Sequence, residues 1–195
     1  MLSYKESLKI LKETDALLEG HFVLSSGLHS DKYVQCAKLL SKPGRAKELC
    51  LSLAEKIKEK YKNIDLILSP AIGGIVIGYE IGRILNIETI FAERVNGNFN
   101  LRRGFEINKG QKILVVEDVI TTGKSSLECV KLIKNANAKL LGFASLIDRS
   151  SKKSLKIKTG ITSHLKIDVP TFNEKQLPRS LKSIPITRPG SRFIK

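Results

Sequence analysis

Short apolar runs alternate with helical stretches through the middle of the chain. The runs that predict strands cover residues 66–68, 89–91, 113–116 and 140–147. The stretches that predict helices cover residues 45–60, the segment from Gly74 to Leu85, and 125–135. Apolar strands that alternate with helices are typical of a parallel sheet covered on both faces. The pattern therefore predicts an α/β protein with a parallel sheet core.

The two ends of the chain follow this pattern less clearly. Residues 4–19 carry apolar side chains at helical spacing and stop before Gly20, which predicts a helical hood or packing arm with a glycine stop. A short strand is expected over residues 33–36. Beyond Ser150 the pattern weakens into short strands and a tail with prolines. Because no repeat or linker divides the chain, we expect one domain over residues 1–195.

Composition narrows the class of protein. Of the 195 residues, 42% are hydrophobic and 27% charged, which is typical of a globular domain. The longest uncharged apolar stretch, residues 66–79, is shorter than the ~20 residues of a membrane-spanning helix. The N-terminus lacks the order of a secretory signal, so the cytoplasm is the expected compartment. Cys36, Cys50 and Cys129 lack any metal-binding spacing and are expected to be reduced and partly buried.

The charge of the chain indicates anionic ligands. There are 34 Lys and Arg against 19 Asp and Glu, a net charge of +15. Residues 149–195 hold 12 basic and 2 acidic residues, which gives +10 of this excess. Most of these lysines are expected to be solvated surface residues. Net charge attracts anions in general, so nucleic acid is only one of the partners that it allows.

The stretch 113–125 carries the clearest chemistry. It predicts a buried strand that ends in Glu117 and Asp118, a turn of small residues, and the start of a helix. Ligands bind at the carboxyl ends of strands in such sheets. The turn offers backbone N–H groups, hydroxyls and a helix N-terminus, which suit a phosphate dianion. A Walker A loop is excluded because Asp118 stands where that motif needs glycine, and the carboxylates favour hydroxyls or a bound cation.

The segment VVEDVITTGKS resembles the phosphoribosyl pyrophosphate (PRPP) signature of type I phosphoribosyltransferases. The resemblance implies that Glu117 and Asp118 hold the ribose 2- and 3-hydroxyls and reach a PRPP-bound Mg²⁺ through water. It also implies a catalytic role for Asp118. The residues implied to hold PRPP, with the 5-phosphate on the last five, are Val119, Ile120, Thr121, Thr122, Gly123, Lys124 and Ser125.

Four further segments are similar to orotate phosphoribosyltransferases, in the order found in that family. They are FVLSSGLHSDKYVQC, SPAIGGIVIG, FAERVNGNFNLRRGF, and IDVPTFNEKQLP with ITRPGSR. The resemblance implies a type I phosphoribosyltransferase fold, a parallel sheet core flanked by helices with a small hood from residues 1–40 and the C-terminal segment. It implies a homodimer that joins orotate to PRPP with Mg²⁺, giving orotidine 5-monophosphate and pyrophosphate in de novo pyrimidine (UMP) synthesis.

The leaving pyrophosphate needs positive charge and N–H donors that strengthen as its own charge develops. The loop over residues 69–74 offers such donors, and PRPP contacts are expected at Ile72, Gly73 and Gly74. Arg94 resembles the pyrophosphate-binding arginine of the family, and the alternative is a surface arginine paired with Glu93.

Residues 95–104 contain three Asn and two Gly and predict a flexible loop that closes over the site. Arg102 and Arg103 are candidate catalytic cations in it, and the resemblance implies that they reach the neighbouring subunit. Only one of them need be functional.

Orotate carries a carboxylate, which a guanidinium binds with two parallel hydrogen bonds. Arg149 resembles the orotate-binding arginine of the family, and a surface Asp148–Arg149 element is the alternative. Ser26, Gly27, His29 and Thr121 are the other expected orotate contacts. The remaining histidines, His21 and His164, are expected to be structural or solvated.

Some positions depart from the common family pattern. Many members carry lysine where this chain has His29 and Gly73, and a loop with Lys and His where this chain has RVNGNFN. The AERxNG and LRRGF segments indicate a variant branch, in which the loop arginines compensate. Two alternatives stay open: a purine-type phosphoribosyltransferase, and a PRPP-sensing regulator that binds nucleic acid. The basic charge favours the regulator, but no recognition motif supports it.

Overall fold

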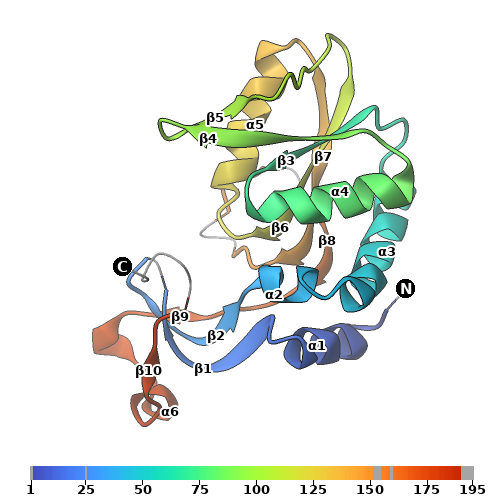
Figure 1. Ribbon diagram of the computed structural model, residues 1–195. Coiled ribbons are helices and arrows are strands. Elements are labelled where there is room, and N and C mark those ends of the chain that lie inside the picture. Colours follow the sequence, from blue (N-terminus) through green and yellow to red (C-terminus); the bar gives the residue numbers. More distant parts are fainter. Residues whose placement is uncertain (1, 25, 152–154, 159, 190–195) are drawn as a thin grey trace.

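A six-stranded sheet forms the centre of the molecule (Figure 1). The computed structural model describes residues 2–24, 26–151, 155–158 and 160–189. The strand order is β5-β4-β3-β6-β7-β8, and all neighbours pair in parallel except β5 with β4. The strands are β3 Leu66–Pro70, β4 Thr89–Val95, β5 Asn98–Leu101, β6 Lys112–Ile120, β7 Lys139–Asp148 and β8 Ile161–Lys166. The prediction of an α/β class with a parallel sheet core is confirmed.

Helices cover both faces of this sheet because successive strand residues point to opposite sides. The helices are α3 Pro43–Lys60, α4 Gly73–Leu85 and α5 Lys124–Asn135. Leu114 and Val116 of β6 belong to one apolar cluster together with residues of α3 and α4. Ile113 and Val115 of the same strand belong to the other cluster, with residues of α5. Side chains along β6 therefore alternate between two faces of the sheet: the face covered by α3 and α4, which we call the α4 face, and the face covered by α5, which we call the α5 face.

A second sheet of four strands lies beyond the carboxyl end of the first (Figure 1). Its order is β10-β1-β2-β9, so both ends of the chain contribute to it. Its strands are β1 Leu17–Val23, β2 His29–Val34, β9 Thr171–Phe172 and β10 Ile186–Thr187, and the short helices nearby are α1 Tyr4–Glu13, α2 Cys36–Leu40, η1 Glu174–Gln176 and α6 Arg179–Lys182. We call this sheet, with η1 and α6, the hood. One domain over residues 1–195 stays a prediction.

The N-terminal segment is not the single helix predicted over residues 4–19. The helix α1 ends at Glu13, where the Thr14 hydroxyl donates a hydrogen bond to the carbonyl oxygen of Ile10 (2.8 Å). The chain then enters β1, which pairs with both β2 and β10. Gly20 therefore lies in a strand and does not stop a helix. Pairing with strands far along the chain overrides the local helical spacing.

The segment 95–104 contains a β-hairpin where a flexible loop was predicted. Asn96 and Gly97 have φ values of 49° and 82° and form a two-residue turn between β4 and β5. An Asn-Gly pair favours this turn because both residues tolerate positive φ. The loop prediction is therefore wrong over Asn98–Leu101.

Smaller boundary differences concern the other elements. The strand predicted over residues 33–36 ends at Val34, and Cys36 begins α2. The loop predicted over residues 69–74 is shorter, because β3 continues to Pro70 and α4 begins at Gly73. The helix predicted from residue 45 begins at Pro43, a residue that suits the first helical turn.

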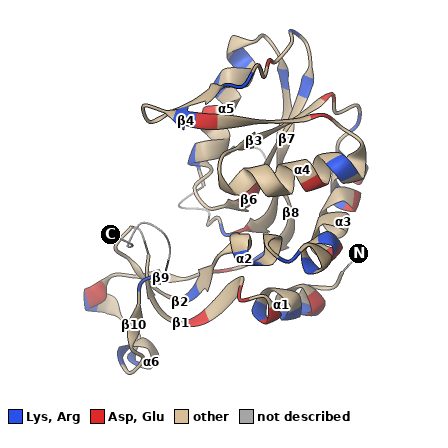
Figure 2. Cartoon of the chain, viewed as in Figure 1, with Lys and Arg blue, Asp and Glu red and all other residues tan. Residues whose placement is uncertain are grey.

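Among the described residues, no helix has the length and apolar character needed to cross a membrane. Figure 2 shows Lys and Arg on elements throughout the described chain. Cys36, Cys50 and Cys129 are buried and unpaired, as predicted.

Candidate active site

Two consecutive carboxylates at the carboxyl end of β6 lie on opposite faces of the central sheet. Glu117 lies on the α5 face, where its Oε1 accepts a hydrogen bond from the Ser126 hydroxyl. Asp118 lies on the α4 face, where a Cβ placed on Gly73 would lie 2.8 Å from both carboxylate oxygens. The acidic pair therefore lies between the start of α4 and the start of α5. This is the edge of the sheet where parallel sheets bind ligands.

Burial controls the ionisation of both carboxyl groups. Glu117 is 8% exposed, and burial raises its pKa to about 7, against the lowering effect of the Ser126 hydrogen bond. Burial also raises the pKa of Asp118, whose Oδ1 accepts a hydrogen bond from the Val119 backbone N–H (2.8 Å). A buried carboxylate is costly without hydroxyl, N–H or cation partners. This edge therefore suits a ligand that brings hydroxyls or a cation.

The turn between β3 and α4 approaches the same edge. Gly73 and Gly74 begin α4 directly after Ile72, which is 85% exposed. A Cβ on Gly74 would lie 3.2 Å from the carbonyl oxygen of Val116, so glycine allows this close packing. The first N–H groups of a helix lack partners within the helix. The structure thus brings these donors beside Asp118, as the sequence predicts for a pyrophosphate site.

A hollow of about 150 Å³ opens at the turn between β6 and α5. Its lining residues are Glu117, Val119, Ile120, Thr121, Thr122, Gly123, Lys124 and Ser125. Gly123, with a φ of 72°, is the residue before the first turn of α5. The Thr122 hydroxyl accepts a hydrogen bond from the Lys124 N–H (3.3 Å). N–H groups and hydroxyls at a helix start are suited to an anion, and all residues predicted to hold PRPP from Val119 to Ser125 line the hollow.

Arg94 extends from β4 toward α5. Its Nη1 lies 2.8 Å from the Glu128 carboxylate on α5, and its guanidinium lies over the Phe99 ring, 4.1 Å from the centroid. Glu128 is one helical turn beyond Lys124, so Arg94 lies near the start of the helix that bounds the hollow. The alternative pairing of Arg94 with Glu93 is not observed. A role for Arg94 in binding pyrophosphate stays a prediction.

Arg102 and Arg103 follow β5 and both pair with Glu93 of β4. The Arg103 Nε donates to the Glu93 carboxylate, and Nη1 of Arg102 lies 3.5 Å from Oε2 of the same carboxylate. The arginine side chains are 58% and 61% exposed. Exposed ion pairs contribute little to stability, so these arginines can change partner at low cost.

Arg149 follows β7 at the boundary between the central sheet and the hood. Its Nε is buried without a hydrogen-bond partner among the described residues, and burial lowers the pKa of its guanidinium. Its electrostatic neighbours include Tyr33 on β2 and Cys36 on α2. The alternative of a surface Asp148–Arg149 element is not observed: Asp148 is buried, and its Oδ2 lies 3.6 Å from Nζ of Lys166. A partly buried guanidinium with a free Nε donor is suited to a carboxylate ligand.

The predicted orotate contacts of the hood lie around the β1–β2 turn. Ser26 and Gly27 are in the turn itself, and His29 begins β2. His29 is buried, with its Nδ1 2.7 Å from Nε2 of His21, whose Nδ1 lies 3.2 Å from the carbonyl oxygen of Ile184. Because a carbonyl only accepts, a neutral His21 donates from Nδ1 and accepts from His29. His21 is therefore structural, and the roles of the other three residues stay predictions.

The residues that contact the predicted site residues Glu117 and Arg94 were not identified from the sequence. Ser126 bonds Glu117 and lies directly after the recognised motif, so no motif position marks it. Glu128 holds Arg94, and only its spacing from Lys124 along α5 could have indicated it.

His164, expected to be structural or solvated, is buried with Nε2 2.8 Å from the Ser7 hydroxyl.

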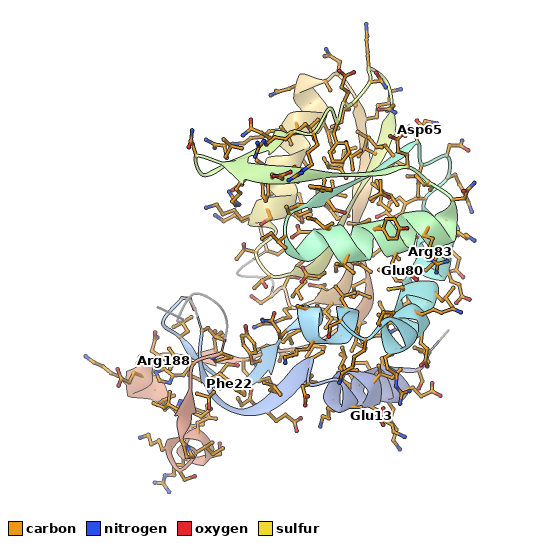
Figure 3. All side chains as sticks on the ribbon, viewed as in Figure 1. Glu13, Phe22, Asp65, Glu80, Arg83 and Arg188 are labelled. Carbon is orange, nitrogen blue, oxygen red and sulfur yellow. The ribbon has the colours of Figure 1, made fainter. Side chains whose placement is uncertain are left out.

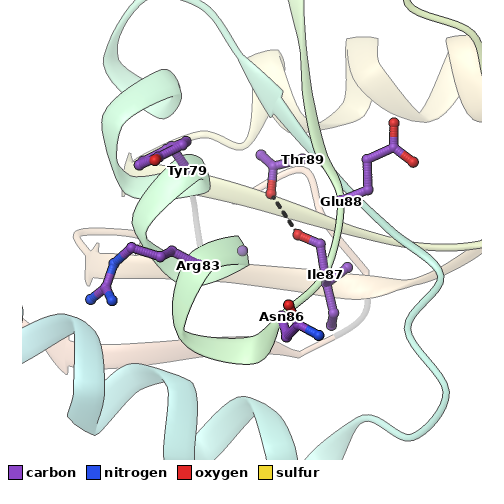
Figure 4. Close-up of a pocket in the computed structure, with 7 residues that line it drawn as sticks. Tyr79, Arg83, Asn86, Ile87, Glu88 and Thr89 are labelled. Carbon is purple, nitrogen blue, oxygen red and sulfur yellow. Dashed lines mark hydrogen bonds between the residues drawn. The ribbon is translucent and has the colours of Figure 1, made fainter.

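A larger hollow of about 350 Å³ lies away from this edge, where α4 ends and β4 begins (Figure 4). Its lining residues are Tyr79, Gly82, Arg83, Asn86, Ile87, Glu88 and Thr89. No predicted site residue lines it. Size alone would favour this hollow, but the buried carboxylates and the free N–H groups lie at the carboxyl edge, which we assign as the candidate active site.

Comparisons with known proteins agree with this assignment. Residues 38–175 match the phosphoribosyl transferase domain family. The chain is 46% identical to the orotate phosphoribosyltransferase of Parvibaculum lavamentivorans over 190 residues, which cover 95% of this chain and 97% of that protein.

Solved structures share the fold at lower identity. Orotate phosphoribosyltransferase from Aeropyrum pernix superposes with a TM-score of 0.69 at 21% identity, over 82% of this chain and 92% of that one. Adenine phosphoribosyltransferase from Saccharomyces cerevisiae gives 0.64 at 18% identity, over 81% and 99%. The fold is thus common to enzymes named for different bases, whereas the 46% identity is to an orotate phosphoribosyltransferase. The chain belongs to the phosphoribosyltransferase family and, within it, to the orotate phosphoribosyltransferases.

Proposed function

We propose that this protein transfers the 5-phosphoribosyl group of PRPP to orotate, giving orotidine 5-monophosphate and pyrophosphate (EC 2.4.2.10) in de novo UMP synthesis. The observation that carries the proposal is the carboxyl edge of β6, where buried carboxylates, the anion hollow and the free donor of Arg149 adjoin. The 46% identity to an orotate phosphoribosyltransferase supports orotate over a purine base.

PRPP binding follows from the chemistry of this edge. The N–H groups and hydroxyls of the turn from Thr121 to Ser125 bind the 5-phosphate. Glu117 and Asp118 accept hydrogen bonds from the ribose 2- and 3-hydroxyls, which supply the partners that buried carboxylates need. These contacts fix the ribose so that its C1 faces the base site.

Displacement at C1 develops positive charge on the ribose and negative charge on the leaving pyrophosphate. Gly73 and Gly74 donate N–H hydrogen bonds to the pyrophosphate, and Arg94 adds positive charge. Arg102 and Arg103 approach as the hairpin closes, in their own subunit or, as the resemblance implies, in the neighbouring one. Closure excludes water and strengthens these electrostatic contacts.

Orotate binds between the sheet and the hood. Arg149 holds its carboxylate with paired N–H donors. Ser26, Gly27, His29 and Thr121 complete the base site.

Mg²⁺ is the proposed cofactor. No group of three or more metal-ligating side chains occurs among the described residues, while Glu117 and Asp118 offer the oxygen atoms that Mg²⁺ prefers. This donor set fits an ion that arrives with PRPP and contacts the carboxylates through water. When bound, the ion neutralises charge on the pyrophosphate.

A homodimer is the proposed assembly. Three large apolar residues are exposed on α4 and at the residue before it: Ile72 (85%), Val76 (51%) and Tyr79 (67%). Their spacing of four and three residues places them on one helix face, and exposed apolar patches mark interfaces. We expect Val76→Glu to shift the protein from dimer to monomer in light scattering, and an unchanged mass would reject this interface.

The cytoplasm is the proposed compartment, without a nucleic-acid or membrane partner. Three buried, unpaired cysteines support a reducing environment. The charge of +15 attracts the anionic substrates PRPP and orotate, so it requires no polymer partner.

The test is consumption of orotate by the purified protein with PRPP and Mg²⁺, followed by absorbance. Parallel reactions contain adenine, hypoxanthine, xanthine or uracil. We expect turnover of orotate alone. Turnover of another base would overturn the role of Arg149, and PRPP binding without turnover of any base would favour the regulator.

A further inference from the structure

A segment outside the recognised motif covers the phosphate turn. The Lys156 N–H donates a hydrogen bond to the Thr122 carbonyl oxygen (3.0 Å). The next residue, Ile157, is 5% exposed and fills the space beside Gly123. A Cβ placed on Gly123 would lie 2.6 Å from both Cγ1 and Cδ1 of Ile157. A hydrogen bond and a side-chain contact therefore join this segment to the centre of the hollow.

The Ile157 side chain packs into the hydrophobic core. It belongs to the apolar cluster that contains Ile120, Cys129 and Ile133, under the turn and the first half of α5. Its side chain therefore cannot move away without losing buried contacts. The position of Gly123, at a φ of 72°, is limited on one side by this fixed side chain.

The same stretch of chain also bonds the start of the turn. The Arg149 N–H donates to the Ile120 carbonyl oxygen (2.8 Å). The carbonyl groups of Ile120 and Thr122 are thus both satisfied by the chain that follows β7. In a planar trans peptide the N–H points opposite to the carbonyl. Fixing these two carbonyls therefore fixes the N–H groups of Thr121 and Gly123 on the opposite side of the turn.

We propose that Ile157 is a positioning residue for the 5-phosphate: with the Lys156 N–H, it holds the Thr122–Gly123 peptide in the orientation that binds the phosphate. The inference rests on the proposed role of this turn in PRPP binding, and it names the element that preorganises the turn. Preorganised groups lose less entropy when the ligand binds.

The experiment measures the binding of ribose 5-phosphate and of pyrophosphate separately, by calorimetry. Ile157→Ala should raise the Kd of ribose 5-phosphate about fivefold, the equivalent of one lost hydrogen bond, and leave the Kd of pyrophosphate within about twofold. Leu155→Ala is the matched control, because Leu155 packs against the same cluster, while the three atoms nearest to a Cβ on Gly123 all belong to Ile157. Ile157→Val, which removes one methyl, should act in the same direction and keeps the test valid if Ile157→Ala does not fold.

Three results would overturn the inference. They are an unchanged Kd of ribose 5-phosphate in both Ile157 variants, an equal rise for pyrophosphate, and an equal effect of Leu155→Ala. Thr122→Ala separates this inference from the proposed function. If Thr122→Ala weakens ribose 5-phosphate binding and Ile157→Ala does not, only the positioning role fails. If Thr122→Ala has no effect, the assignment of the turn fails and the inference fails with it.

Discussion

The β6 edge and the β4–β5 hairpin organise their charges in opposite ways. At the edge, Glu117, Asp118 and Arg149 are at least partly buried, and none of them forms an ion pair among the described residues. In the hairpin, Arg102 and Arg103 are more than half exposed and share the Glu93 carboxylate.

This difference indicates two roles for charge in one site. Buried charges without a counter-ion lower stability, so the edge is built for a ligand that supplies the missing partners. Exposed pairs cost little to open, so the hairpin can deliver its arginines when the ligand is bound. We therefore propose that the edge provides fixed binding groups and that the hairpin provides mobile charge.

Asp118→Asn should have the largest effect on activity. Loss of the negative charge that positions the ribose should lower kcat/KM about 10³-fold, while the free energy of unfolding stays equal or rises, because a buried charge is removed. Steady-state kinetics and urea unfolding measure the two quantities. Asp65→Asn is the matched control (Figure 3), since Asp65 also bonds a backbone N–H at β6, that of Lys112 (2.8 Å), but at the amino end of the sheet. Equal losses of activity in both variants would contradict the assignment.

Arg149→Lys should have the next largest effect. An ammonium cannot form the paired hydrogen bonds of a guanidinium, so the KM for orotate should rise about 30-fold to 100-fold, with the KM for PRPP little changed. Arg45→Lys is the control, because Arg45 is half exposed on α3 and pairs with Glu13 at 3.1 Å. A larger rise in the KM for PRPP than in the KM for orotate would show that Arg149 does not belong to the orotate subsite.

The pH dependence of stability tests the burial of the edge. Burial raises the pKa of Glu117 to about 7 from 4.5, so between these values the folded protein holds a proton that the unfolded chain releases. The free energy of unfolding therefore falls as pH rises, by about 2 kcal/mol between about pH 5 and pH 7.5. Glu117→Gln should remove this fall in the free energy of unfolding, measured by denaturant titration of the ligand-free protein at each pH.

His164 provides the opposite slope away from the edge. Burial lowers its pKa to about 4 from 6.5, so its contribution to the free energy of unfolding is lost as pH falls through this range. His164→Gln should remove that loss and keep a donor for Ser7. The wild type should thus vary little between pH 5 and pH 6.5, whereas the two variants should have slopes of opposite sign. Equal slopes in all three proteins would show that neither group is buried in solution.

Local sequence determined the elements that were predicted correctly. The apolar run before Glu117 and the turn at Gly123 depend on strand parity and on a helix start, which neighbouring residues specify. The candidate site could be placed because the acidic pair and the turn from Thr121 to Ser125 are consecutive in the sequence. The motif alone sufficed to place these groups at the carboxyl edge.

Contacts between distant residues explain what was missed. Residues 17–23 form β1 because they pair with β2 and β10, the second of which lies at the other end of the chain. The contact of Ile157 with Gly123 and the ion pair of Arg94 with Glu128 join segments about 34 residues apart. The spacing of hydrophobic residues along the chain does not predict such contacts, because they depend on how the strands are ordered in the sheet.

Arg103→Ala should have the smallest effect and sharpens the comparison of edge and hairpin. Removal of the mobile charge should lower kcat about tenfold, while loss of an exposed pair should change the free energy of unfolding by less than about 1 kcal/mol. Arg83→Ala is the control, since Arg83 forms an equally exposed pair with Glu80 through two hydrogen bonds of 2.8 Å, outside the site (Figure 3). If Arg83→Ala lowers kcat equally, the effect belongs to overall charge. If Arg103→Ala destabilises the fold without changing kcat, the hairpin arginines are structural and the division between fixed and mobile charge is wrong.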